Sequence, residues 1–194
     1  MAATVDEIDL LRSRQYDLLA TLVGRVPCAR VLGQVGGLSG DGTTLGRALG
    51  RLGAAAREAD PRAIERDHFE TFIGVGRGRL LPYASYYLTG FLNERPLARV
   101  REDFAALGIE RSESTSEPED HVAILLEVMA GLASGRVEAE PGAEARFFAR
   151  HLQPWAPRLF ADLAEQADTE FYRALGELGR IFLEIEAEAF AMDA

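Results

Sequence analysis

The chain has 194 residues, of which 47% are hydrophobic and 27% charged, a composition typical of a soluble globular protein. Its formal net charge of −10 argues against nucleic acid or anionic lipid as a partner. The single cysteine, Cys28, excludes an internal disulfide and a thiolate metal site. All 21 basic residues are arginines, so no lysine is available for Schiff-base chemistry or for a phosphate-binding loop.

The negative charge is distributed unevenly. Residues 1–116 hold 15 acidic and 15 basic side chains, and residues 117–194 hold 16 acidic and 6 basic ones, a net charge of −10. This asymmetry either suits a basic partner or only keeps the protein soluble. The N-terminus lacks the basic region of a secretory signal, and no apolar stretch approaches about 18 residues. We therefore expect a cytoplasmic protein without membrane insertion.

Apolar residues recur with helical spacing along the N-terminal part of the chain, between turn-forming residues. Thr43 or Thr44, and Asp60 before Pro61, are predicted helix starts. The spacing predicts helices at about 5–26, 28–35, 44–56, 61–72, 83–88 and 94–107. A glycine-rich loop is expected at 74–82. Five aromatic residues flank it and indicate either core packing or a peptide-binding groove: Phe69, Phe72, Tyr83, Tyr86 and Tyr87.

A polar run follows and is read as a linker, residues 109–116. Beyond it the spacing predicts helices at about 116–133, 141–152, 157–163 and 168–190, the last capped by Asp168 and Thr169. No segment alternates as a strand does. The predicted fold is all-α, with about ten helices in one structural domain of two parts, 1–116 and 117–194.

The start of the second part carries a helix-start signature. Ser116 followed by Glu119 is a capping box, and Pro118 would lie in the first turn, where it needs no N–H. The carboxylates of Glu117 and Asp120 would face the positive end of the helix dipole. This stretch is either a well-formed helix start or a binding element.

His121 lies in register with Leu125, Val128 and Leu132, on or beside the buried face of that helix. It could be a polar contact in a groove beside Asp120. These two side chains could also form an acid/base pair, but no second catalytic group is visible, so we expect no enzyme activity. The three histidines have no neighbour at helical spacing that would complete a metal site, and no cofactor is expected.

Taken together, several blocks resemble the TorD/DmsD family, the cytoplasmic chaperones that mature molybdenum-cofactor oxidoreductases. The resemblance runs in order over nearly the whole chain, with Glu-Pro-x-Asp-His and Pro-Tyr-x-Ser-x-Tyr as its most specific parts. The blocks are 72–76 (Phe-Ile-Gly-Val-Gly), 81–87 (Leu-Pro-Tyr-Ala-Ser-Tyr-Tyr), 117–121 (Glu-Pro-Glu-Asp-His), 151–155 (His-Leu-Gln-Pro-Trp) and 171–172 (Phe-Tyr). The loop at 74–82 departs from the pattern, because many members have a Gly-Pro segment and two prolines before the tyrosine.

The resemblance implies two helical parts joined by a hinge, here residues 109–116, in a monomer or a domain-swapped homodimer. It implies binding of the twin-arginine signal peptide or N-terminal region of an apo-oxidoreductase, with formate dehydrogenase as the closest client type. Carboxylates bind guanidinium groups well, and an apolar groove accepts an apolar segment. The client-binding positions that it implies are Tyr83, Ser85, Tyr86, Glu117, Pro118, Asp120 and His121.

Two other functions stay open from the residues alone. One is a small-molecule enzyme that uses Asp120 and His121 as an acid/base pair. The other is a structural adaptor bundle without a peptide groove. Asp120 is expected to accept a hydrogen bond from a client arginine or to orient His121.

Overall fold

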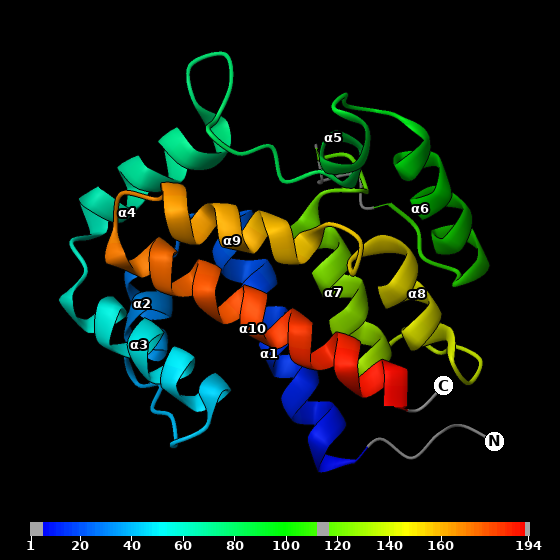
Figure 1. Ribbon diagram of the computed structural model, residues 1–194, viewed down its shortest axis with the longest axis horizontal. Coiled ribbons are helices and arrows are strands. Elements are labelled where there is room, and N and C mark those ends of the chain that lie inside the picture. The colour runs from blue at the N-terminus through cyan, green and yellow to red at the C-terminus, as the bar shows by residue number, and fades with distance from the viewer. Residues whose placement is uncertain (1–5, 112–116, 193–194) are drawn as a thin grey trace. The chain divides into compact units, whose positions relative to one another are not determined.

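The computed structural model describes residues 6–111 and 117–192. Within these ranges the chain forms ten α-helices, one π-helical turn and no strand, which confirms the all-α prediction. The helices group into two compact units, each made of two stretches of chain. Figure 1 shows the order of the helices along the chain.

The first unit comprises residues 1–24 and 82–155. Its helices are α1 (Glu7–Gly24), α5 (Ala84–Thr89), α6 (Arg95–Ala106), α7 (Val122–Ala133) and α8 (Ala143–His151). Helix α7 is apolar on nearly all sides, as expected for a helix surrounded by protein. It packs along α1, and both helices contribute fully buried side chains to the core, among them Leu22, Leu125 and Met129.

The second unit comprises residues 25–81 and 156–194. Its elements are α2 (Ala29–Gly36), α3 (Thr44–Glu58), α4 (Pro61–His68), the π-helical turn η1 (Phe69–Ile73), α9 (Ala156–Gln166) and α10 (Glu170–Met192). Helices α9 and α10 lie side by side (Figure 1). They can approach closely because Gly176 has no side chain. A Cβ at this position would lie only 2.4 Å from the backbone nitrogen of Ala164.

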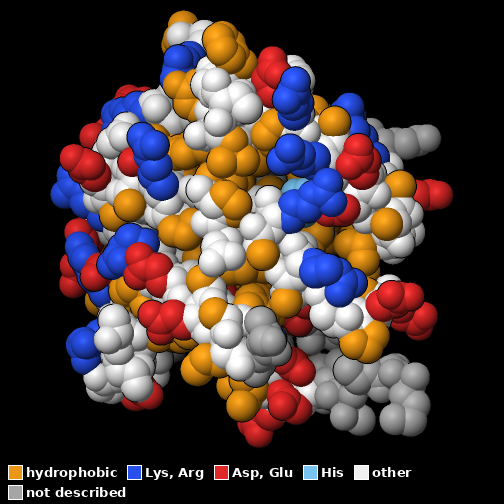
Figure 2. Space-filling model, turned by 45° about the vertical axis from the view of Figure 1, so that its right-hand side comes forward, with side chains coloured by type: hydrophobic (Ala, Val, Ile, Leu, Met, Phe, Trp, Pro, Cys, Tyr) orange, Lys and Arg blue, Asp and Glu red, His pale blue; other side chains and the backbone are white. Residues whose placement is uncertain are grey.

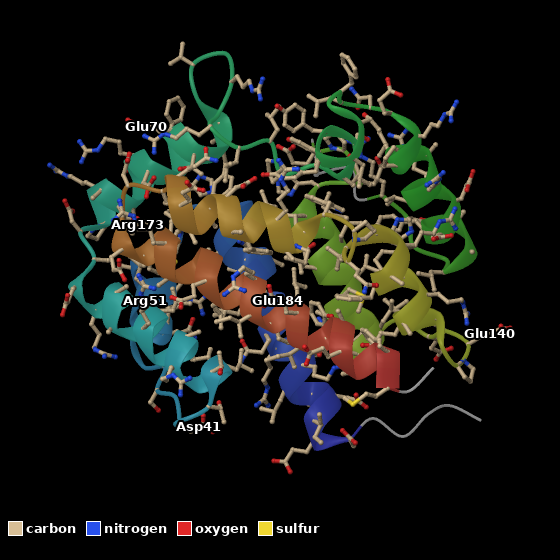
Figure 3. The ribbon with its side chains drawn as sticks, in the orientation of Figure 1. Asp41, Arg51, Glu70, Glu140, Arg173 and Glu184 are labelled. Atoms are coloured by element: carbon tan, nitrogen blue, oxygen red, sulfur yellow. The ribbon has the colours of Figure 1, made fainter. Side chains whose placement is uncertain are left out.

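Helix α10 also contacts α3, and an exposed arginine links the two helices. Arg51 on α3, labelled in Figure 3, donates to Glu170 at 2.7 Å and to Glu177, both on α10. These bonds raise the pKa of Arg51.

Several predicted helix starts are confirmed. The Thr43 hydroxyl accepts from the Gly46 N–H at 3.0 Å, and the Asp60 carboxylate accepts from the Arg62 N–H at 3.0 Å. The Thr169 hydroxyl accepts from the Tyr172 N–H at 3.3 Å at the start of α10. Local cap signals therefore located these starts correctly.

The two units divide the chain differently from the predicted parts 1–116 and 117–194. The first unit holds residues on both sides of position 116, because α5 and α6 belong with α7 and α8 rather than with α3 and α4. The expected hinge, 109–116, lies partly outside the described residues and stays a prediction.

Candidate functional site

Two motif segments far apart in the sequence are joined in the first unit. Tyr83 and His121 form an isolated antiparallel β-bridge. The Val122 N–H donates to the Pro82 carbonyl at 2.8 Å, and the Ala84 N–H donates to the Asp120 carbonyl at 3.0 Å. The start of α5 and the start of α7 are thus held together by backbone hydrogen bonds.

Asp120 reinforces this junction with its side chain. Its carboxylate is 1% exposed and accepts a hydrogen bond from the Ser85 N–H at 2.8 Å, in the first turn of α5. A carboxylate in this place satisfies a helix-end donor and faces the positive end of the helix dipole. Asp120 therefore caps α5, from 35 residues away in the sequence.

His121, rather than Ser116, caps α7. Its Nδ1 accepts from the Ala123 N–H at 3.1 Å, and its ring meets that of Tyr83 edge to face, with centroids 5.1 Å apart. The side chain is 8% exposed, as expected from its register with the buried face of α7.

The predicted helix start at the capping box was wrong. Helix α7 begins at Val122, and Ser116 lies outside the described residues. Pro118 and Glu119 belong to a turn that the His121 N–H closes by donating to the Pro118 carbonyl at 3.0 Å. The backbone bonds to Pro82 and Ala84 flank His121, which is extended, so the helix begins only at Val122.

Glu117 and Glu119 make separate contacts. The Tyr83 hydroxyl donates to Glu117 at 2.5 Å, and burial followed by this carboxylate raises the pKa of Tyr83 well above its usual range. Glu119 pairs with Arg101 of α6 at 2.9 Å. Burial opposes ionisation of Glu119, but the Arg101 guanidinium prevails and lowers its pKa.

Residues 90–94, named here the Phe91 loop, follow α5 and present apolar side chains to solvent. Leu88, Phe91 and Leu92 are 44%, 69% and 45% exposed. Gly90 ends α5 with φ +83°, and the Glu94 N–H donates to the Ser85 hydroxyl at 3.2 Å. In the sequence, this loop is marked by two apolar residues between turn formers, Gly-Phe-Leu-Asn at 90–93.

The remaining predicted site residues are half-buried or divided between the units. Tyr86 and Pro118 are half-buried in the first unit. Among the flanking aromatics, Phe69 and Phe72 fall in the second unit and the three tyrosines in the first. A single groove formed by all five stays a prediction.

The described residues contain no group of three or more His, Cys, Asp or Glu side chains that could hold a metal ion. None of the described helices is both long and apolar enough to span a bilayer. Asp120 and His121 both use side-chain acceptors at helix starts, the carboxylate at α5 and the ring Nδ1 at α7.

Comparison with known proteins places this chain in a family. The family model described as nitrate reductase delta subunit matches residues 39–161, which include both motif segments. Chaperone protein TorD of Vibrio cholerae serotype O1 is 33% identical over 131 residues, 62% of this chain and 59% of that protein. Chaperone protein TorD of Aliivibrio salmonicida is 32% identical over 146 residues, 70% of this chain and 67% of that protein.

The chain thus spans about three fifths of the length of the Vibrio relative. A crystal structure of a candidate redox enzyme maturation protein from Archaeoglobus fulgidus matches with a TM-score of 0.58, over 88% of this chain and 93% of that one. At 20% identity this likeness establishes the fold alone.

Fold and sequence together define an all-helical protein that matches the nitrate reductase delta subunit model over residues 39–161. The chain belongs to the TorD family, whose model is named for the nitrate reductase delta subunit. Both named relatives are chaperones, which agrees with the expectation of a non-catalytic protein.

Proposed function

We propose that this protein is a cytoplasmic chaperone for the maturation of a molybdenum-cofactor oxidoreductase. It binds the apoenzyme at its N-terminal region and holds it until the cofactor has been inserted. The observation that carries the proposal is the family match over residues 39–161, which contains both segments of the bridged junction.

The proposed ligand is a twin-arginine signal peptide, which has two guanidinium groups followed by an apolar segment. The junction links an exposed carboxylate to the element that carries exposed apolar side chains. Glu117 accepts from the Tyr83 hydroxyl just before α5, and Leu88 and Phe91 reach solvent at the end of α5 and beyond it. Figure 2 shows apolar side chains at the surface among arginines and carboxylates. Guanidinium–carboxylate pairing and apolar contact are the two interactions that such a peptide offers.

The motif residues divide into two roles in this proposal. Tyr83, Tyr86, Glu117 and Pro118 are exposed or half-buried and contact the client directly. The buried Ser85, Asp120 and His121 hold α5 and α7 in the arrangement that presents them. A formate dehydrogenase is the proposed client type, and proofreading before export or assembly is the proposed outcome.

The experiment is purification of the tagged chain from its native host, with identification of what co-purifies. An apo-molybdoenzyme supports the proposal, whereas a bound metabolite supports an enzyme and the absence of any oxidoreductase supports an adaptor bundle. Titration of the client's leader peptide, compared with a version in which both arginines are glutamine, then tests signal recognition. Light scattering after gel filtration distinguishes a monomer from a domain-swapped homodimer.

A further inference from the structure

A pocket of about 240 Å³ lies in the first unit, among the end of α6, the chain that follows it, the turn before α7 and α7 itself. Its lining residues are Phe104, Ile109, Glu110, Arg111, Glu117, Glu119, Ile124, Glu127, Val128 and Val137.

Half of the described lining is apolar, and three of these five side chains are only partly covered. Phe104 and Val128 are buried at 6% and 7% exposure, whereas Ile109, Ile124 and Val137 are half-buried. Partly covered aliphatic side chains in a hollow gain further burial when another apolar group enters, at about 25 cal/mol per Å². The apolar lining therefore favours an aliphatic or aromatic side chain as part of the occupant.

The rest of the lining is strongly acidic. Four of the ten residues are glutamates and one is an arginine, so the lining has a formal charge of −3 (one positive and four negative side chains). One of these glutamates already holds a guanidinium of the chain itself, since Glu119 pairs with Arg101 at 2.9 Å. With Arg101 counted, the charge around the described lining is still −2 (−3 plus one), which favours a cation such as a guanidinium.

We infer that this pocket binds a guanidinium of a peptide together with the apolar side chain that neighbours it. The inference rests on the proposed function, which it deepens by naming the surface where the leader's charged region binds. Glu110 and Glu127, both exposed, face the incoming cation, and Ile109 and Ile124 contact the apolar neighbour. Glu127 is the one charged residue in the apolar helix α7 (Val-Ala-Ile-Leu-Leu-Glu-Val-Met-Ala-Gly-Leu-Ala), a signal already present in the sequence.

The test uses isoleucine methyl NMR of the full chain. The sequence has only seven isoleucines, of which Ile109 and Ile124 line the pocket. The probe is the blocked hexapeptide Ser-Arg-Arg-Leu-Phe-Leu, and its control carries citrulline, a neutral isostere, in place of both arginines. The arginine peptide is expected to shift the Ile109 and Ile124 methyl signals in a saturable way, and the citrulline peptide to bind much more weakly.

Two double variants test whether the peptide binds to the pocket itself or to the acidic surface in general. The double change Glu110→Gln and Glu127→Gln is expected to lower the affinity for the probe roughly 5- to 30-fold. Each exposed pair of a glutamate with a peptide arginine contributes up to about 1 kcal/mol. The matched double change Glu138→Gln and Glu140→Gln removes the same charge from exposed positions outside the pocket; Glu140 is labelled in Figure 3. This control is expected to leave affinity within about twofold.

Each result bears on a separate claim. No shift of Ile109 and Ile124, or equal losses in the two double variants, overturns the pocket inference. If the client apoenzyme still binds the wild-type chain in that case, the proposed function stands. If the probe binds in the pocket but no oxidoreductase binds the chain, the pocket is a site for cationic peptides and the proposed function fails.

Discussion

The carboxylate of Asp120 accepts a hydrogen bond from the backbone N–H of Ser85 at 2.8 Å. This bond ties the turn before α7 to the first turn of α5, and Ser85 in turn accepts from the Glu94 N–H at the end of the Phe91 loop. One buried acid therefore supports the element that carries the exposed apolar side chains.

Asp120→Asn is expected to lower the free energy of unfolding by about 1 kcal/mol and Asp120→Ala by about 2–3 kcal/mol. Asparagine still offers an acceptor oxygen, whereas alanine leaves the Ser85 N–H unpaired in a buried place. Urea denaturation measures both changes.

Asp120→Asn is also expected to weaken binding of the client's leader peptide by about tenfold or more, since α5 and the Phe91 loop lose support. Calorimetric titration at a temperature where both proteins are folded measures this. Equal affinities with a lower melting temperature would mean that Asp120 is a cap alone and that the client binds elsewhere.

His121→Ala is expected to destabilise the protein by about 0.5–2 kcal/mol, because α7 loses the acceptor for its Ala123 N–H. His121→Asn keeps a good capping side chain but loses the ring contact with Tyr83, so it should lie between the wild type and alanine. Denaturant midpoints for the three proteins provide the measurement. An asparagine variant no more stable than the alanine variant would contradict the capping role.

Features that depend only on residues close in the sequence could be predicted from the sequence. The caps at Thr43, Asp60 and Thr169 rest on a side chain and an N–H two or three positions away, and all three form. The start of α7 instead depends on a pairing with Pro82 and Ala84, which no local pattern contains.

The π-helical turn Phe69–Ile73 escaped prediction for the same reason. The chain returns after the glycine-rich loop, where the Arg79 N–H donates to the Glu70 carbonyl at 3.1 Å and the Leu80 N–H to the Thr71 carbonyl at 2.8 Å. These bonds satisfy carbonyls that a continuing helix would have used. The acidic pocket could not be predicted from the sequence either, because its two sides come from α6 and α7, which are separate in the sequence.

Tyr172→Phe is expected to leave stability at pH 7 unchanged or raise it by up to about 1 kcal/mol. The Tyr172 hydroxyl is fully buried and has no hydrogen-bond partner among the described residues, so its removal ends a desolvation cost. Chemical denaturation at pH 7 measures the difference. A loss of more than about 1 kcal/mol would indicate that the hydroxyl has a partner.

The same variant should change the response to alkali. Burial, followed by the charge of Asp67, raises the pKa of Tyr172 above that of an unfolded tyrosine, about 10. The unfolded chain therefore loses its proton first, and stability present below pH 10 declines as pH rises further. Tyr172→Phe is therefore expected to lose less of its free energy of unfolding above pH 10 than the wild type does. The same is expected of Tyr83→Phe, because the pKa of Tyr83 is also raised.

Asp67→Ala is expected to cost about 2–4 kcal/mol in the second unit. The Asp67 carboxylate is 2% exposed and accepts from the Thr169 N–H at 2.8 Å, the Thr169 hydroxyl at 2.7 Å and the Thr71 hydroxyl at 3.0 Å. Its removal leaves two donors at the start of α10 and one in η1 without this acceptor. The control Asp168→Asn alters an exposed pair with Arg79 and should change stability by less than about 0.5 kcal/mol.

Phe91→Ala is expected to weaken binding of the client's leader peptide by about 10- to 100-fold while stability stays within about 0.5 kcal/mol. Phe91 is 69% exposed, so the folded chain loses little packing, whereas a bound apolar segment would lose about 1.5–3 kcal/mol of burial. The control Met192→Ala removes an apolar side chain that is 80% exposed at the end of α10. Peptide titrations and melting curves for the three proteins decide: an affinity loss for Phe91→Ala alone supports contact with the client, and equal affinities in all three would place the apolar contact away from the Phe91 loop.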